Sequence, residues 1–269
     1  MEIVLWIILS VLCLVDCIVL IIFLVKRRSR NKALKTQIDY TAKIVHDLRT
    51  PIYAIDGFTL LSTQCIDQPD KVAIYLDKIK RISHQMLTLV NDSIDLAKLQ
   101  NDKLELVEQE TDLVECINIC VENIEAQIMN KNIVFEKNIL IKHSVVKTDA
   151  RVLIRILLNL LSNALKYTPS NGTIRLYVLE WEKNETEATY HFEIQDTGNG
   201  ISKEFQKHIF EPFSQEGKVE HTDTESSGLG MFIVKNLVEQ MKGKLLLNSE
   251  EHVGTQFIAL FDFEYKEEM

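Results

Sequence analysis

The chain contains 269 residues, of which 46% are hydrophobic and 26% are charged. This composition is sufficient for one large or two ordinary globular domains and is unlike that of a disordered chain. The formal net charge is −9, and residues 36–269 carry 24 Lys and Arg against 37 Asp and Glu. A nucleic-acid-binding protein is therefore disfavoured, because this acidic surface would repel a phosphate backbone. The five cysteines are too few and too scattered for a disulfide framework.

Residues 3–25 form an apolar run that is interrupted only by Ser10, Asp16 and two cysteines. As a helix rising 1.5 Å per residue, this run spans roughly 34 Å, enough to cross the core of a bilayer. We therefore predict a transmembrane helix at 1–25 and a basic juxtamembrane linker at 26–38. The positive-inside rule places the rest of the chain in the cytoplasm. The expectation is a single-pass protein of the cell membrane, without an extracellular sensor domain.

Asp16 lies near the middle of the predicted membrane span, where an ionised side chain is costly. In a dimer, two Asp16 carboxyls could share a proton, or each could pair with a basic residue of a separate membrane partner. The alternative is a single polar residue that is tolerated because the helix is long enough to insert anyway.

Residues 39–103 are predicted to form an antiparallel helical hairpin with its turn at 67–70 (Asp-Gln-Pro-Asp). Each helix shows an apolar seam whose positions alternate in steps of three and four. The first seam is Leu34, Ile38, Thr41, Val45, Leu48, Ile52 and Ile55, and the second is Tyr75, Ile79, Ile82, Met86, Leu89, Ser93 and Leu96. Such a hairpin leaves an apolar stripe uncovered, so we expect a homodimer in which two hairpins form a four-helix bundle.

From residue 104 to 269 the pattern changes to mixed α and β. Helices are expected near 112–129, 150–167 and 228–241. Extended segments are expected near 132–141, 173–182 and 189–196, with a closing hairpin near 244–263. Eight of the nine glycines lie at or after position 172. Turns with positive φ are therefore concentrated in this part of the chain.

His46, in the segment 46–51 (HDLRTP), is the first candidate for chemistry. The seam spacing places His46 one residue off the hydrophobic core, with its ring in solvent. Asp47 can hydrogen-bond one imidazole nitrogen and leave the other neutral and nucleophilic. Thr50 follows about one helical turn later, where its hydroxyl could orient a water molecule. His84 is expected to be equally exposed, and we interpret it as an ordinary surface residue.

A second group of polar side chains falls on one face of the expected helix at 150–167. Asn159, Asn163 and the pair Lys166 and Tyr167 share this face because of their spacing. Amide oxygens suit Mg²⁺, an ammonium group suits phosphates, and an aromatic ring lies beside them. The alternative is a solvated face opposite the Leu-rich stripe of the same helix.

Three glycine-bearing loops favour a ligand site over a solvated face. They are 196–201 (DTGNGI) after a strand, 226–231 (SSGLGM) at the start of a helix, and 253–257 (VGTQF) in the last hairpin. Glycine lets the backbone approach a ligand closely, and a glycine turn at a helix start points free N–H groups at phosphate. The candidate residues in these loops are Asp196, Gly198, Gly200, Gly228, Leu229, Gly230 and Thr255.

Taken together over residues 36–264, these motifs resemble the sensor histidine kinases of two-component systems. The phosphoacceptor box lies at His46, the N box ends at Asn163, the glycine boxes lie at Asp196 and Gly228, and the phenylalanine box is 210–213. The resemblance implies a dimerisation and phosphotransfer hairpin followed by an α/β two-layer sandwich of the Bergerat ATP-binding type. It also implies ATP and Mg²⁺ as cofactors and a cytoplasmic response regulator as partner.

The resemblance gives the candidate residues their roles. His46 would be the phosphorylated nucleophile, Asp47 its polarising partner, and Thr50 a residue for phosphatase activity toward the regulator. Asn163 would coordinate Mg²⁺, and Asp196 would accept a hydrogen bond from the adenine amino group. The remaining nucleotide-binding positions would be Asn159, Lys166, Tyr167, Gly198, Gly200, Gly228, Leu229, Gly230 and Thr255, with residues 211–227 as a lid over ATP.

Two departures from the family pattern concern the lid and the grip on the phosphates. Ser226 stands where the family usually has another glycine, and Ser214-Gln215 stand where a basic residue usually follows the phenylalanine box. A degenerate kinase that acts as a membrane scaffold is therefore one alternative. A Bergerat-type ATPase is another, but Asn159 occupies the position where those enzymes carry a glutamate, and an asparagine cannot act as a general base.

Overall fold

The computed structural model describes residues 40–100, 105–216 and 227–265. By internal contacts the chain divides into two compact units, Met1–Leu89 and Val90–Met269, so that the last turns of α2 belong to the second unit. The predicted membrane helix, the basic linker and Asp16 lie outside the described residues. Within the described part of the chain, no helix combines the length and the apolar character needed to cross a membrane.

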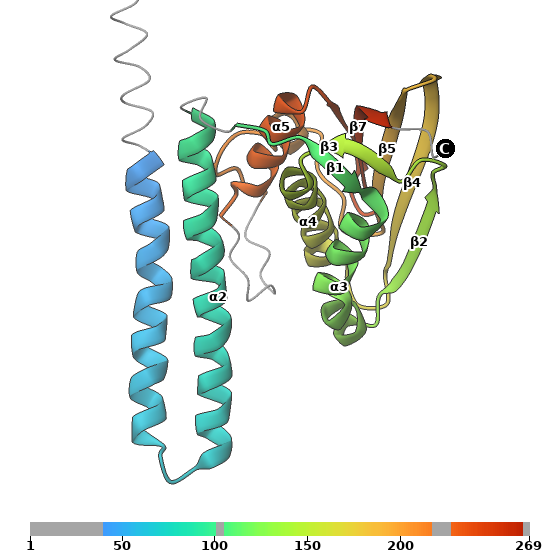
Figure 1. Cartoon of the computed structure of the whole chain (residues 1–269). Helices are drawn as coiled ribbons and strands as arrows, with labels where there is room; N and C mark the ends of the chain where they lie inside the picture. Colours follow the sequence, from blue (N-terminus) through green and yellow to red (C-terminus); the bar gives the residue numbers. More distant parts are fainter. Residues whose placement is uncertain (1–39, 101–104, 217–226, 266–269) are drawn as a thin grey trace, which may run out of the picture. The chain divides into compact units, whose positions relative to one another are not determined.

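The first unit is a helical hairpin, as the sequence predicts (Figure 1). One helix covers residues 40–64 and continues through Pro51, and the second is α2 (Pro69–Gln100). The turn lies at 65–68, two residues earlier than expected. Proline is favoured at the first helical position because its missing N–H is not needed there, and Asp70 complements the positive end of the helix. These two residues therefore begin α2 rather than the turn.

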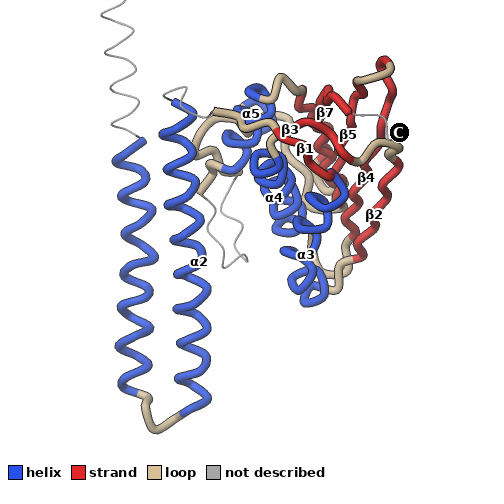
Figure 2. Tube along the Cα trace, viewed as in Figure 1, coloured by secondary structure: helices blue, strands red, loops and turns tan. Residues whose placement is uncertain are grey.

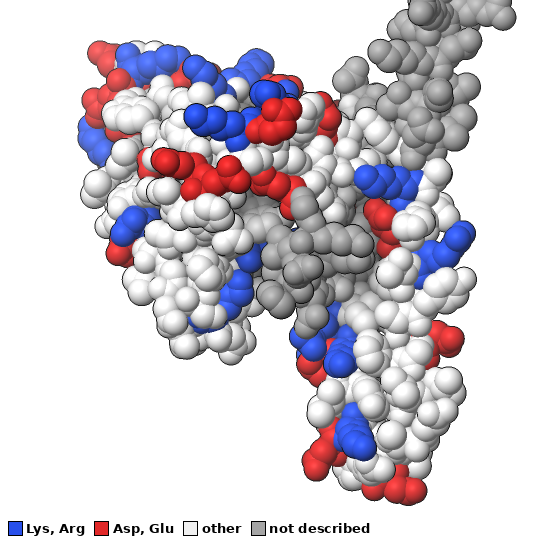
Figure 3. Space-filling model, turned by 180° about the vertical axis from the view of Figure 1, so that it is seen from behind, with Lys and Arg blue, Asp and Glu red and all other residues white. Residues whose placement is uncertain are grey.

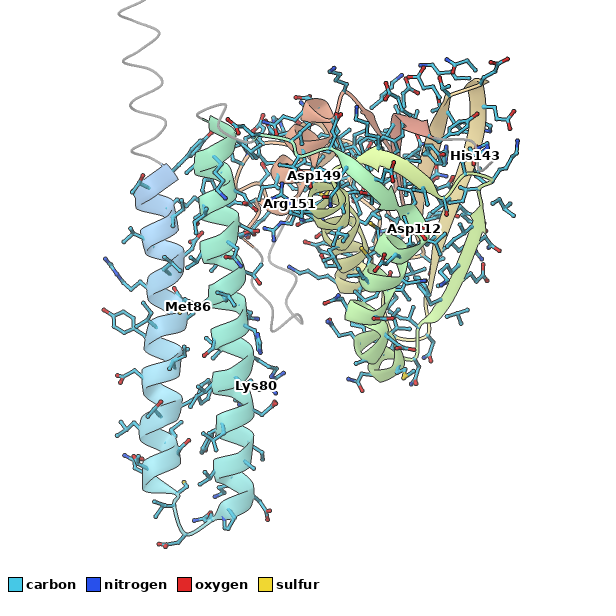
Figure 4. The ribbon with its side chains drawn as sticks, viewed as in Figure 1. Lys80, Met86, Asp112, His143, Asp149 and Arg151 are labelled. Carbon is cyan, nitrogen blue, oxygen red and sulfur yellow. The ribbon has the colours of Figure 1, made fainter. Side chains whose placement is uncertain are left out.

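The apolar seam of α2 lies where the sequence places it. Its positions from Tyr75 to Leu89 are half-buried, and Leu96 is buried. Met86, labelled in Figure 4, is one of these half-buried positions. The ring of Tyr75 stacks on Phe58 of the first helix with 6.0 Å between the ring centroids. This pair fastens the two helices near the turn.

The seam of the first helix is only partly covered within the hairpin. Leu48 and Ile55 are half-buried, but Val45 and Ile52 are 51% and 49% exposed. Phe58 is half-buried one turn beyond Ile55. The exposure of Val45 and Ile52 agrees with the expectation that a single hairpin leaves an apolar stripe uncovered. Val45 and Ile52 thus remain uncovered within the hairpin.

The second unit is an α/β two-layer sandwich (Figure 2). Its strands are β1 (Gln109–Asp112), β2 (Val134–Leu140), β3 (Val145–Thr148), β4 (Thr173–Asn184), β5 (Glu187–Asp196), β6 (Lys244–Glu250) and β7 (Gly254–Tyr265). The strand order is β1-β3-β7-β5-β4-β2, and β6 also pairs with β7. Among these pairs, β2 and β4 run parallel and the others antiparallel.

Three helices cover one face of this sheet: α3 (Leu113–Lys131), α4 (Ala150–Tyr167) and α5 (Gly230–Gln240). A 3-10 turn, η1 (Phe205–Lys207), lies between β5 and α5. On the side seen in Figure 3, acidic side chains form a band across the α/β unit, in line with the acidic balance of the sequence. The helices and long strands occur where the sequence predicts them, whereas β1 and β3 were not predicted.

The core lies between the helices and the covered face of the sheet. Leu157 and Leu160 of α4 are fully buried, as are Tyr190 and Phe192 of β5 and Phe261 of β7. Burying one large apolar side chain contributes about 1.5–3 kcal/mol. The Leu-rich stripe of α4 is therefore anchored on the sheet, and the opposite side of the helix is left for polar residues.

Capping side chains fix the starts of α3 and α4 (Figure 4). Asp112 Oδ1 accepts the Val114 N–H at 2.8 Å. Asp149 Oδ1 accepts the Arg151 N–H at 3.1 Å, and its Oδ2 accepts the Val107 N–H at 2.9 Å. The Arg151 side chain also pairs with Asp149. Asp149 thus joins α4 to the segment that precedes β1.

We expect Asp149→Ala to lower the free energy of unfolding by about 2–3 kcal/mol, because it removes a helix cap and leaves a second backbone donor without its acceptor. Asp112→Ala is the matched control, since it removes a cap alone, and it should cost about 1 kcal/mol. Urea unfolding of both variants measures the difference. Equal losses would show that the Val107 contact adds nothing.

Candidate functional site

His46 lies in the first unit, on the helix over 40–64. Its side chain is 75% exposed, and its Nδ1 atom lies 3.1 Å from Asp47 Oδ1. Because a carboxylate only accepts hydrogen bonds, Nδ1 is the donor in this contact and Nε2 keeps its lone pair. The ring is thus exposed and held by Asp47, as predicted. His84 is exposed on α2, also as predicted, and Thr50 is exposed on the same helix as His46.

The remaining candidate residues lie in the second unit, around α4. Asn159, Asn163 and Lys166 are half-buried on the helix, and Tyr167 ends it. Lys166 Nζ lies 5.2 Å from the centroid of the Tyr167 ring. Burial lowers the pKa of the Lys166 ammonium group, because desolvation penalises the charged form. An anion bound beside this face would offset that penalty.

Asp196 ends β5 with its side chain buried. Its Oδ1 accepts the Gly198 N–H at 2.8 Å, and the Thr255 N–H also donates to the carboxyl group. Burial raises the pKa of Asp196 to about 6, although these two hydrogen bonds act in the opposite direction. At neutral pH the site therefore contains a buried carboxylate that can accept further hydrogen bonds.

The loops beside Asp196 are packed so closely that they require glycine. A Cβ on Gly254 would lie 2.0 Å from the Asp196 carbonyl oxygen, and one on Gly200 would lie 1.9 Å from the Glu250 carbonyl oxygen. Both glycines also have positive φ, 142° and 67°. A Cβ on Gly198 would lie 2.6 Å from the carbonyl oxygen of Tyr167. The first glycine loop is thus pressed against the end of α4.

The second glycine loop lies at the other end of the polar face of α4. Gly228 has a φ of 68°, and its carbonyl accepts the N–H of Phe213 from the phenylalanine box at 2.9 Å. A Cβ on Gly230 would lie 2.9 Å from Asn159 Oδ1. The start of α5 therefore lies beside Asn159. Leu229 is fully buried and its N–H donates to Ser227 Oγ at 3.1 Å, so its role in nucleotide binding stays a prediction.

The second unit thus brings the predicted residues together along α4. The start of α5 lies beside Asn159, the first glycine loop lies beside Tyr167, and Asn163 and Lys166 occupy positions between them. Ser226 and residues 217–225 of the expected lid lie outside the described residues. Asp92, a buried carboxylate that contacts the elements of this site, is not among the residues predicted from the sequence. The sequence feature that could have pointed to Asp92 is a charged residue next to the apolar seam of α2.

Two family models match the chain. The His Kinase A (phospho-acceptor) domain matches residues 36–102, and the histidine kinase-, DNA gyrase B- and HSP90-like ATPase matches residues 148–265. The solved structure of histidine kinase ThkA in complex with response regulator protein TrrA shares the fold, with a TM-score of 0.61 and 24% identity. The match covers 89% of this chain and 65% of that chain.

Two curated relatives are similar along most of the chain. Autoinducer 2 sensor kinase/phosphatase LuxQ of Vibrio parahaemolyticus is 32% identical over 87% of this chain, and sensor histidine kinase YclK of Bacillus subtilis is 31% identical over 83%. The chain spans 27% and 46% of the lengths of these relatives. With both family models matched in order, the chain belongs to the sensor histidine kinases and carries a phosphoacceptor domain followed by an ATP-binding domain.

Proposed function

We propose that the chain is an ATP-dependent protein histidine kinase that phosphorylates His46 and passes the phosphoryl group to an aspartate of a cytoplasmic response regulator. The observation that carries the proposal is the exposed His46 ring, held at Nδ1 by Asp47, in a chain whose second unit gathers nucleotide-type loops around α4. An exposed nucleophile with one nitrogen fixed and the other available is what phosphoryl transfer to histidine requires.

The side chains around α4 fit a nucleotide. Asp196 is a buried acceptor suited to an exocyclic amino group, Lys166 is a half-buried cation suited to phosphate, and the start of α5 supplies backbone N–H groups. Asn163 would hold Mg²⁺ through its amide oxygen, and Asn159 lies one turn earlier. When bound, Mg²⁺ would neutralise phosphate charge.

In the transfer step, Nε2 of His46 would form a bond to the γ-phosphorus while the bond from that phosphorus to the bridging oxygen breaks and ADP leaves. Positive charge then develops on the imidazole. The Asp47 carboxylate, 3.1 Å from Nδ1, would stabilise that charge and hold the ring in place. In the second step the phosphoryl group would move from Nε2 to a carboxylate oxygen of the regulator.

The proposal extends to the assembly. Val45 and Ile52 are uncovered apolar residues on the phosphoacceptor hairpin, and a second copy of the chain would cover them in a homodimer. ThkA was solved with a response regulator, which supports a partner of the same class here.

Residues 1–25 would anchor the protein in the cell membrane by a single pass, with the catalytic domains in the cytoplasm and Asp16 available to a membrane partner.

The test is incubation of the full chain with Mg²⁺ and ATP that is radiolabelled at the γ-phosphate. We expect label that is stable to base and labile to acid, as for a phosphohistidine, and a loss of at least about tenfold in Asn163→Ala. Absence of label in the wild type despite nucleotide binding would favour the scaffold alternative. Release of free phosphate without labelled protein would favour the ATPase.

A substitution of Thr50 tests for phosphatase activity toward the regulator, an activity that the name of the LuxQ relative also mentions. It is exposed one helical turn after His46, where a hydroxyl could orient water against a phosphoaspartate. Thr50→Ala should slow dephosphorylation of the regulator by about tenfold or more and change autophosphorylation by less than about twofold. The two rates are measured with the same regulator. Equal loss of both would refute a specific role for Thr50.

A further inference from the structure

Asp92 is a buried carboxylate near the end of α2, within the second unit. Its two oxygens have different partners. Oδ1 accepts a hydrogen bond from Arg155 Nη2, and Oδ2 accepts one from the Ser227 hydroxyl at 3.0 Å. Asp92 thus joins residues that lie 63 and 135 positions further along the chain.

Both partners belong to the elements that build the nucleotide site. Arg155 lies on α4, and its carbonyl oxygen accepts a hydrogen bond from Asn159 Nδ2 at 2.9 Å. Ser227 immediately precedes Gly228, and its hydroxyl oxygen accepts the Leu229 N–H at 3.1 Å. One hydroxyl group therefore holds the start of α5 and is itself held by Asp92.

A packing role alone does not explain a charge at this position. Leu96 and Leu99, on the next turns of α2, fill buried positions with apolar side chains. Replacing a buried ion pair by apolar residues is often neutral or stabilising. Burial also raises the pKa of Asp92, although the guanidinium of Arg155 and the hydroxyl of Ser227 counter this shift. Burying the Asp92 carboxylate therefore costs folding free energy that a leucine at the same position would not cost.

We propose that Asp92 is a positioning residue that makes nucleotide affinity depend on the placement of the last turns of α2. It does so by holding the second glycine loop through Ser227 and α4 through Arg155. Movement of this helix end away from the loop breaks the Asp92–Ser227 bond and frees the start of α5. The inference rests on the proposed nucleotide site for its functional meaning.

The test is a double-mutant cycle on the full chain, with AMPPNP as the probe and calorimetry as the measurement. Asp92→Asn and Ser227→Ala should each weaken AMPPNP binding by about tenfold, the equivalent of one hydrogen bond to a charged group. Because both changes remove the charge-assisted hydrogen bond from the Ser227 hydroxyl to the Asp92 carboxylate, the double variant should lose little more than either one. Ser227→Thr keeps the hydroxyl and should restore the affinity.

Asp95→Asn is the matched control. Asp95 lies on the same helix and pairs with the same Arg155 at 3.1 Å, so it shares the guanidinium contact of Asp92 without the bond to Ser227. Its AMPPNP affinity should stay within about twofold of the wild type. Amide exchange at Leu229 supplies an independent readout, because its N–H donates to Ser227 Oγ. Exchange should quicken in Asp92→Asn and stay unchanged in Asp95→Asn.

Full affinity in Ser227→Ala, additive losses in the double variant, or an Asp95→Asn loss equal to that of Asp92→Asn would overturn the proposal. If Asp92→Asn does not fold, the difference in AMPPNP affinity between Ser227→Ala and Ser227→Thr decides alone. Label on His46 is followed in parallel. Non-additive losses of AMPPNP affinity without labelling of His46 would overturn the kinase proposal and leave the role of Asp92 standing. Labelling of His46 with unchanged AMPPNP affinities in the variants would overturn the role of Asp92 and leave the kinase proposal standing.

Discussion

His46→Gln should abolish autophosphorylation, with label falling at least about a hundredfold. The glutamine side chain has a similar reach, but the lone pair of its amide nitrogen is delocalised and cannot attack phosphorus. Nucleotide affinity should be unchanged, because His46 lies in the first unit and the nucleotide-type loops lie in the second. Labelling with γ-radiolabelled ATP and titration with AMPPNP measure the two properties separately.

His84→Gln is the matched control for this prediction. His84 is an exposed histidine on α2, and the residues on either side of it, Ser83 and Gln85, are not acidic. It should keep full labelling, which would show that exposure of an imidazole is not sufficient. Undiminished label in His46→Gln would remove His46 as the phosphoacceptor, and loss of label in both variants would point to a general defect.

Asp196→Asn should raise stability and strongly weaken nucleotide binding. Burial raises the pKa of Asp196 to about 6, so the folded state holds a proton more tightly than the unfolded chain. The carboxyl group therefore contributes no penalty below about pH 4, and stability falls as the pH rises from about 4 to 6. At pH 7.5 the ionised group costs up to about 2–3 kcal/mol, which the neutral amide removes.

The amide oxygen introduced by Asp196→Asn can still accept the N–H of Gly198. The new amino group would face the exocyclic amino group of adenine, donor against donor, so AMPPNP affinity should fall by about a hundredfold. Thermal unfolding at pH 7.5 and pH 5 should show a gain that shrinks at the lower pH. Tight AMPPNP binding, or a loss of stability at pH 7.5, would contradict the assignment.

Asp262→Asn provides the opposite case. Lys183 and Thr189 hold the pKa of Asp262 below its usual range through hydrogen bonds from their side chains. Its charged form is therefore stabilised by folding, and the contribution is lost as the pH falls through the lowered pKa. Asp262→Asn should slightly lower stability at pH 7.5 and leave AMPPNP binding intact. The two aspartates thus predict stability changes of opposite sign.

Local signals predicted α4 best. The expected helix near 150–167 matches the bounds Ala150–Tyr167, which the structure fixes at the start with the Asp149 cap. Strands β1 and β3 have four residues each, too few to establish an alternating pattern. They exist because they pair with other strands, which is a property of the whole sheet rather than of the segment.

In the site, too, residues in short local motifs could be predicted, and contacts that depend on the tertiary fold could not. His46, Asp196 and the glycine loops carry short motifs, so their neighbourhoods could be predicted from adjacent residues. The burial of Leu229 depends on tertiary packing of the start of α5, which the motif does not encode. The bond between Asp92 and Ser227 spans 135 residues, and each residue alone has the features of an ordinary polar position. Contacts of this kind can be found only once the fold is known.

The position of β7 in the sheet has a consequence for synthesis of the protein. This strand pairs with β3, β5 and β6, although it is the last strand in the described chain. None of these three pairings can form until residues 254–265 have left the ribosome. The earlier strands must therefore wait with exposed edges, open to aggregation, and chaperone binding to the nascent chain would be most valuable during this interval.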